Sequence, residues 1–306
     1  MVDELLQHKV EFTKLPAFDW RGPAAPIKDY LSIESSPDDV WFIGWAQSPL
    51  IEIIRHKEGR KYGLVVGLTK MNFDPLVFTG ALKDLREKER LSIYDKIFAN
   101  SRWCRECIAR AYPQLAEKVA VTGFPFDFEI YQPYLDTVKE DDLIVFNQRF
   151  SLERLYMLEV ETARILIQRG YRVKHLSGTP VSKLVQRAPA LAPFLAAAET
   201  TGLEFVFNPV KEIYHKNLAK ASVVVTTSIA DMLPSSLIEA IVLGSVPVAP
   251  NSFCFPEFVH KDNLYTPYDL NEIIDIVEKK PQSSHSVCQY DKKTVVENFL
   301  REMGLA

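Results

Sequence analysis

The sequence predicts an α/β protein of two lobes, each built around a parallel β-sheet. Short β-branched runs such as residues 223–227 alternate along the chain with helical segments, and this βαβα order favours parallel sheets. The runs are apolar throughout, as expected for strands that are buried on both faces. A length of 306 residues is enough for two hydrophobic cores.

The predicted elements divide into two lobes and a tail. Residues 1–135 form the expected first lobe, residues 136–280 the second, and residues 281–306 a C-terminal segment with a helix. The two lobes are expected to be linked by residues 131–140. Predicted strands are residues 10–12, 40–44, 62–67, 96–99 and 119–121 in the first lobe, and residues 143–147, 171–176, 205–207, 223–227 and 246–250 in the second.

The composition is that of an ordinary globular protein with no global basic field. Hydrophobic residues make up 47% and charged residues 25%, the net charge is -4, and the pI is about 5.9. No apolar run is long enough to span a membrane and the N-terminus has no signal-peptide pattern, so a cytoplasmic protein without membrane insertion is expected. A basic cluster at residues 55–61 could contact a polyanionic acceptor, or could be a solvated helix end and loop.

Four cysteines raise the question of a zinc site. Cys104 and Cys107 form a CxxC pair, and His285 and Cys288 are spaced as HxxC, so the two pairs together offer four ligands. The first pair lies in a helical pattern without the turn residues of a zinc knuckle. We therefore favour the alternative, small partly buried thiols in a reducing compartment, and expect no metal site.

One βαβ unit, residues 221–250, carries the candidate site. A buried strand is followed by a turn and by a helical segment that ends at Gly244, and such sheets bind ligands outside the carboxyl ends of their strands. The start of the helix offers N–H groups and a partial positive charge, which suit an anionic group such as a diphosphate. The alternative is an ordinary N-cap at one of its two serines. The expected anion-binding residues are Pro234, Ser235, Ser236 and Leu237.

Two carboxylates, Asp231 and Glu239, stand in the same unit with seven residues between them. A carboxylate at this edge of a sheet can accept hydrogen bonds from the hydroxyl groups of a ribose or a sugar. The alternative for Glu239 is a solvated helix residue without a ligand.

Two arginines follow an earlier buried strand. Arg149 and Arg154 are five positions apart at the predicted carboxyl end of residues 143–147. Their guanidinium groups can converge on one diphosphate, since their planar forks match its oxygens. The alternative is an ion pair with Glu153 or Glu159 on a helix surface.

These residues together resemble the donor-binding segment of family 4 retaining glycosyltransferases with the GT-B fold. That family has two acidic residues separated by seven others, then Ala and a Gly-x-Pro-Val strand. In this sequence the matching residues are Asp231, Glu239, Ala240, Gly244, Pro247 and Val248. The first acid of the family is usually Glu, and Leu233 with Pro234 stands where Phe-Gly is usual. Arg149 matches the arginine that binds the donor diphosphate, and Arg154 stands where the family has lysine.

The resemblance implies a GT-B architecture of two Rossmann-like lobes with a cleft between them. It implies that the C-terminal helix packs back on the first lobe, which is expected to be abbreviated because the family's opening strand and Gly-rich loop have no counterpart. The implied donor is a nucleotide sugar, most naturally a UDP-sugar. Glu239 would hold the ribose, Asp231 would orient the sugar, and Pro209 and Val210 would lie against the base.

The implied activity is transfer of a sugar to a soluble acceptor, with retention. No Asp-x-Asp motif is present to hold a divalent cation, so no metal requirement is expected. Pro256, Glu257 and residues 263–267 are loosely similar to glycosyltransferases that modify queuosine in tRNA, and other compact members of the family modify bases of phage DNA, so a modified base in DNA or tRNA is one candidate acceptor. The alternatives are a non-catalytic nucleotide-sugar binder and a GT-B sugar-nucleotide epimerase.

Overall fold

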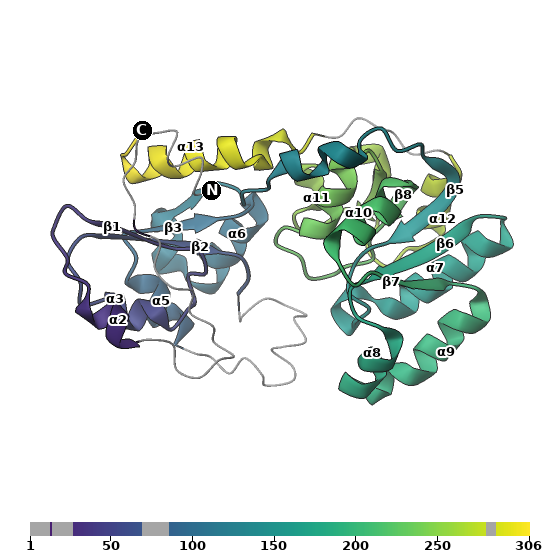
Figure 1. Cartoon of the computed structure of the whole chain (residues 1–306), viewed down its shortest axis with the longest axis horizontal. Coiled ribbons are helices and arrows are strands. Elements are labelled where there is room, and N and C mark those ends of the chain that lie inside the picture. The colour runs from purple at the N-terminus through teal and green to yellow at the C-terminus, as the bar shows by residue number, and fades with distance from the viewer. Residues whose placement is uncertain (1–12, 14–26, 69–85, 280–285) are drawn as a thin grey trace. The chain divides into compact units, whose positions relative to one another are not determined.

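The computed structural model describes residue 13 and residues 27–68, 86–279 and 286–306 (Figure 1). The predicted strand at residues 10–12 and His285 lie outside these residues. The chain forms two compact units, Met1–Phe126 with Cys288–Ala306, and Asp127–Val287. The first boundary lies between Phe126 and Asp127, earlier than the expected 135/136, because Tyr131 packs against His215 of the second unit with ring centroids 5.0 Å apart.

Unit 1 is built on a four-stranded parallel sheet in the order β1-β2-β3-β4. Its strands are β1 (Val40–Ile43), β2 (Arg60–Val65), β3 (Lys96–Ala99) and β4 (Val119–Val121). Its helices are α2 (Ile27–Ser32), α3 (Leu50–Ile54), α5 (Glu87–Ser92), α6 (Arg102–Ala111), the 3-10 helices η1 (Pro113–Lys118) and η7 (Cys288–Tyr290), and α13 (Lys292–Met303). Ser101 caps the start of helix α6, because its hydroxyl accepts a hydrogen bond from the backbone N–H of Cys104 at 3.0 Å.

Helix α13 belongs to the core of unit 1 although it comes from the end of the sequence. Its residues Val295, Phe299 and Met303 cluster with Tyr62 and Phe98 of the sheet. The rings of Phe98 and Phe299 stack with centroids 5.2 Å apart. Figure 1 shows α13 lying along the sheet of its own unit.

Unit 2 is built on a six-stranded parallel sheet in the order β10-β9-β8-β5-β6-β7. Its strands are β5 (Glu140–Phe146), β6 (Arg172–Ser177), β7 (Glu204–Phe207), β8 (Ala221–Val225), β9 (Val246–Pro250) and β10 (Leu264–Tyr265). Its α-helices are α7 (Tyr156–Gln168), α8 (Val181–Arg187), α9 (Ala192–Thr201), α10 (Lys211–Ala219), α11 (Ser235–Val242) and α12 (Leu270–Glu278). The short 3-10 helices are η2 (Phe128–Tyr134), η3 (Leu152–Arg154), η4 (Pro189–Leu191), η5 (Phe255–Glu257) and η6 (Lys261–Asn263).

The strand order of unit 2 is that of a Rossmann sheet. Numbered within the unit from the β7 edge it reads 3-2-1-4-5-6, and the order reverses between β5 and β8. The apolar runs that predicted these strands form the core, in which Ile144, Val225 and Val248 are buried beneath α7 and α12. The carboxyl ends of β5 and β8 therefore lie side by side at the point where sheets of this order bind ligands.

The basic cluster at residues 55–61 is largely occupied by contacts within unit 1. The ammonium group of Lys57 donates to the carbonyl oxygens of Leu31 at 2.8 Å and Ile33 at 2.5 Å. That of Lys61 donates to two carbonyl oxygens at 2.8 and 2.9 Å, and Arg60 donates to the carbonyl of Met303 at 2.8 Å. These charges tie loops and a helix end together, which favours the structural interpretation of the cluster over a polyanion site.

Candidate functional site

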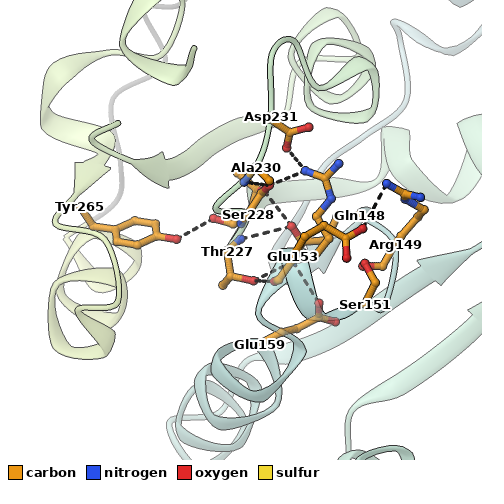
Figure 2. Close-up of polar contacts among 12 residues, drawn as sticks. Gln148, Arg149, Ser151, Glu153, Glu159, Thr227, Ser228, Ala230, Asp231 and Tyr265 are labelled. Atoms are coloured by element: carbon orange, nitrogen blue, oxygen red, sulfur yellow. Dashed lines mark hydrogen bonds and ion pairs between the residues drawn. The ribbon is translucent and has the colours of Figure 1, made fainter. Parts of the chain in front are cut away.

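The candidate site lies at the reversal point of the unit 2 sheet. Arg149 and Arg154 follow β5, and Asp231 follows β8, so two loops bring these residues together. Figure 2 shows the two loops with Arg149 and Asp231 labelled. The loops also bond to each other, because the backbone N–H of Ile229 donates to the carbonyl of Glu153 at 3.0 Å. Strand β8 ends at Val225, earlier than predicted, although the backbone N–H of Thr226 still donates to the carbonyl of Val248 on β9 at 3.0 Å. The hydroxyls of Thr226 and Thr227 hydrogen-bond with Gln148.

Arg154 and Asp231 form an ion pair within this site. Nη1 of Arg154 contacts Oδ2 of Asp231 and also the hydroxyl of Ser228. The two side chains are 13% and 8% exposed, so the pair is mostly shielded from water. A charge buried in this way is stabilised only while its partner is present. Ser228 was not foreseen as a site residue, although its place after two threonines at a strand end was the available signal.

Arg149 has a different environment from Arg154. Its Nη2 lies 3.1 Å from Oε1 of Glu153, as the helix-surface alternative expected, and its side chain is 70% exposed whereas that of Glu153 is 4% exposed. Arg149 and Arg154 thus contact different carboxylates in this structure. The charge of Arg149 remains open to solvent, where it is accessible to an anion.

Helix α11 begins without a side-chain cap. Pro234 is the N-cap residue, and both serines expected as alternative caps lie inside the helix, so the N-cap alternative is wrong. The N–H groups of Leu237 and Ile238 donate to the carbonyl of Pro234 at 3.1 and 3.2 Å. The Leu237 side chain is 1% exposed and faces the core. The helix end accessible to an anion is therefore its first two residues, Ser235 and Ser236.

The start of α11 is held against β5 by one amide side chain. Nδ2 of Asn147 donates to the carbonyl of Ser236 at 2.6 Å and to the hydroxyl of Tyr214 at 3.2 Å. This contact places the helix start beside the loop that carries Arg149 and Arg154.

Glu239 is 9% exposed, so the interpretation of this residue as a solvated helix residue is wrong. Its Oε1 accepts from the ammonium group of Lys211 at 2.9 Å. The hydroxyls of Tyr131 and Tyr214 also lie beside the carboxylate, and burial together with the charge of Glu239 raises the pKa of Tyr214 well above its usual value. Three donors from α10 and η2 thus surround one carboxylate. Lys211 was not foreseen from the sequence, because it is 28 residues away along the chain.

Pro209 and Val210 lie between β7 and α10 and are exposed, Val210 by 50%. Phe207 at the end of β7 is also 47% exposed. These three residues give the β7 edge an open apolar surface.

The cysteines do not assemble a metal site among the described residues, which contain no group of three or more potential ligands. Cys104 is buried and Cys107 is partly buried, and burial raises the pKa of the Cys107 thiol to about 11. A thiol with that pKa stays protonated at neutral pH and is a poor ligand and nucleophile. No helix in the described parts of the chain is both long and apolar enough to cross a membrane.

Comparison with known proteins identifies the fold. No family model and no curated protein sequence matches the chain. Among solved structures, S. aureus TarM, in a mutant complex with fondaparinux, alpha-GlcNAc-glycerol and UDP, matches with a TM-score of 0.61 and 16% identity over 91% of this chain and 56% of TarM. Anabaena HepE with UDP and glucose matches with a TM-score of 0.67 and 12% identity, over 88% of this chain and 78% of HepE.

A third match is the UDP-forming alpha,alpha-trehalose-phosphate synthase of Burkholderia xenovorans with glucose-6-phosphate, at a TM-score of 0.64 and 9% identity over 88% of this chain and 73% of that protein. The chain spans just over half the length of TarM. Identities this low establish the fold. The protein has an α/β GT-B-like fold with parallel sheets of four and six strands, which confirms the predicted fold class.

Proposed function

We propose that this protein is a glycosyltransferase that uses a nucleotide-sugar donor, with UDP as the nucleotide. The observation that carries the proposal is the Arg154–Asp231 pair, which lies at the reversal point of a Rossmann sheet. Two of the matched structures, TarM and HepE, contain UDP. The exposed helix start at Ser235 adds a second positive group beside that pair.

In this proposal Arg149, Arg154 and the start of α11 bind the donor diphosphate. Fixed positive groups stabilise the charge that develops on the leaving diphosphate, and they need no reorganisation during the reaction. Arg154 is pre-positioned by Asp231, whereas the exposed Arg149 closes onto the anion. We therefore propose turnover without a divalent metal.

The rest of the donor is assigned to neighbouring residues. Glu239 accepts hydrogen bonds from the ribose, and the exchangeable Lys211 is the partner that the ribose replaces. The apolar edge at Pro209 and Val210 takes the base, and Asp231 orients the transferred sugar while it holds Arg154. Retention of configuration follows from the family resemblance, and one matched structure is described as a study of glycosyl transfer with retention in trehalose-6-phosphate synthase.

The acceptor is proposed to be a soluble molecule, with a modified base in DNA or tRNA as the specific candidate from the sequence likeness. Neither the fold comparisons nor the engaged basic cluster adds support for a nucleic-acid acceptor. A glycan or small-molecule acceptor is therefore tested beside it.

The test is incubation with a panel of UDP-, GDP- and ADP-sugars without acceptor, followed by mass spectrometry. A transferase slowly releases free nucleotide diphosphate and sugar, a non-catalytic binder holds the donor intact, and an epimerase changes the sugar with the diphosphate bond intact. Arg154→Met is the control, and it should lose whichever of these three behaviours the wild type shows. The proposal is refuted if the wild type neither binds nor consumes any nucleotide sugar of the panel.

Metal dependence is a separate measurement once donor and acceptor are known. Turnover in excess EDTA should fall by less than about tenfold, equivalent to roughly 1.4 kcal/mol in the barrier. Loss of activity in EDTA with recovery in Mn²⁺ or Mg²⁺ would contradict the assignment of the arginines.

A further inference from the structure

Gln148 joins the two loops of the candidate site. It follows Asn147 at the end of β5, is 7% exposed, and uses both ends of its amide (Figure 2). Its Nε2 donates to the hydroxyl of Thr227 at 2.7 Å and to the carbonyl of Arg154 at 3.2 Å. Its Oε1 accepts from the hydroxyl of Thr226 at 2.8 Å and from the backbone N–H of Thr227 at 3.3 Å. One side chain thus binds the loop after β5 and the loop after β8.

A buried acid and a buried histidine stand behind Gln148. Oε2 of Glu159, in the first turn of α7, accepts from Nε2 of Gln148 at 3.1 Å. Oε1 of Glu159 lies 2.5 Å from Nδ1 of His175 on β6, and both side chains are completely buried. The His175 ring packs against Phe150 and Phe205, with centroids 5.5 and 4.9 Å away. The amide of Gln148 is therefore held by Glu159 as well as by the residues of the two loops.

The carbonyl of Arg154 is the point at which this network meets the site. It accepts from Gln148 and also from the hydroxyl of Thr227. The next residue, Leu155, has φ 47°, a left-handed conformation that is strained for a side chain with a Cβ. Such a turn persists only where surrounding contacts hold it. The hydrogen bonds on the Arg154 carbonyl are contacts of this kind.

Stability alone does not account for these residues. Apolar side chains of similar volume often replace buried ionic groups with no loss of stability, or with a gain. An apolar replacement here would remove the bonds from Gln148 to Arg154, Thr226 and Thr227 and would leave the Thr227 hydroxyl as the remaining side-chain donor to the Arg154 carbonyl.

We infer that Gln148, backed by Glu159 and His175, is a positioning residue that sets the Arg154 guanidinium for the donor diphosphate. This inference rests on the proposed function, since it assigns the group that orients a residue of the same site. It has a specific consequence. Loss of Gln148 weakens binding of a diphosphate and spares binding of the nucleoside, because the ribose and base contacts lie at Glu239 and at the β7 edge.

The direct test is Gln148→Met, which keeps the length of the side chain and removes its hydrogen bonds. UDP affinity, measured by calorimetry, should fall at least tenfold, while uridine affinity, measured by NMR titration, should stay within twofold. Ser245→Ala is the matched control, because Ser245 is 3% exposed and its hydroxyl donates to the carbonyl of Ala221 at 2.9 Å at the amino ends of β8 and β9, away from the candidate site. This control should lower the melting temperature and leave UDP affinity within twofold.

Two further variants separate positioning from folding. Glu159→Gln can still accept from Gln148 and donate to His175, so UDP affinity should remain within threefold of the wild type. The double variant Glu159→Met with His175→Leu should fold with an unchanged or higher melting temperature and still lose UDP affinity. Wild-type UDP affinity in Gln148→Met, or an equal loss of uridine affinity, would overturn the inference.

Hydrogen exchange makes the outcome independent of the donor assignment. Amides in residues 149–155 and 226–231 should exchange faster in Gln148→Met than in the wild type, while those of β9 should not change. If the wild type fails to bind UDP but exchange accelerates in this way, the proposed function is wrong and the role of Gln148 in placing the loops stands. Unchanged exchange in both loops would overturn that role whatever the ligand.

Discussion

The two acids of the βαβ unit at residues 221–250 form contrasting ion pairs. Asp231 pairs with Arg154, and both side chains are mostly buried, with 8% and 13% exposed. Glu239 pairs with Lys211, whose side chain is 68% exposed while that of Glu239 is 11% exposed. Both side chains of the first pair are mostly shielded from water. The exposed lysine of the second pair can instead be replaced by solvent or by a ligand.

Two acids of one motif therefore do not depend equally on their ion-pair partners. Asp231 depends on one buried cation and on that cation's contacts. Glu239 has the hydroxyls of Tyr131 and Tyr214 beside it as well as Lys211, so it keeps polar partners when the lysine leaves. The first pair therefore maintains the structure of the site, and the second is suited to exchange with a ribose.

The largest expected effect comes from breaking the buried pair. Arg154→Met should lower the free energy of unfolding by about 3 kcal/mol, because Asp231 is left as a buried charge without its cation. Lys211→Met is the matched control and should cost less than about 1 kcal/mol, the scale for an exposed pair. Urea denaturation followed by circular dichroism measures both. Asp231→Leu added to Arg154→Met should restore most of the loss, and equal costs for the two single variants would remove the distinction between the pairs.

The exchangeable pair should reveal itself in binding. Glu239→Ala should weaken nucleotide-sugar binding by roughly 1 to 3 kcal/mol, the scale for losing a charged hydrogen-bond acceptor. Lys211→Met should leave affinity unchanged or improve it, because the ribose no longer competes with the ammonium group. Calorimetry with the retained donor measures both. Unchanged affinity in a folded Glu239→Ala protein would rule out the ribose role.

Variants of Arg149 test whether a solvent-exposed cation contributes to UDP binding. Arg149→Ala should weaken UDP binding by about tenfold, and Arg149→Lys should weaken it less, since a point charge keeps the attraction but loses the bidentate fork. The effect should be smaller than for Arg154, because the exposed side chain is ordered by only one ion pair. Uridine binding serves as the reference. If uridine loses as much affinity as UDP, Arg149 does not contact phosphate.

The smallest expected effect is the pH dependence of the free energy of unfolding that comes from His215, which is influenced by Glu239 and Lys211. Burial lowers the pKa of His215, and the charge of Glu239 only partly opposes this shift. The unfolded chain therefore binds more protons than the folded protein as pH falls through the ordinary value of about 6.5, and the free energy of unfolding falls with it. His215→Phe keeps a ring against Tyr131 and should flatten this slope. Urea denaturation at pH 5.5 and 7.5 compares variant and wild type, and identical slopes would contradict the assignment.

The sequence was sufficient for the class of fold and for the described strands other than β10 (Leu264–Tyr265), which was not foreseen. Continuous β-branched runs such as residues 223–225 are buried in parallel sheets because only that environment accommodates apolar side chains on both faces. It was also sufficient to select the edge of the sheet that carries the candidate site. Boundaries were less accurate. At the end of β8 the backbone N–H of Thr226 still donates to Val248 of β9, whereas that of Thr227 donates to the side chain of Gln148.

The pairing of charges could not be predicted. Arg154 was correctly placed near a strand end, but its contact with Asp231 joins residues 77 positions apart, and no local pattern encodes that distance. The same holds for Lys211 and for the buried contact between Glu159 and His175, which depends on how α7 packs against β6. Local patterns predicted which residues reach the site, and tertiary packing decides which of them meet.

Because α13 completes unit 1 from the C-terminal part of the chain, the two units can finish folding at different times during synthesis. The ribosome completes residues 127–287 of unit 2 before it makes the residues that finish unit 1. Until α13 emerges, the sheet face around Tyr62 and Phe98 lacks the side chains of Val295, Phe299 and Met303 that cover it. Domains generally fold as units during translation, so unit 2 can complete its core while the first-made half of the chain still has an open apolar face. The unit that begins first is therefore the one that must wait, and its exposed face is the surface that chaperones would have to protect.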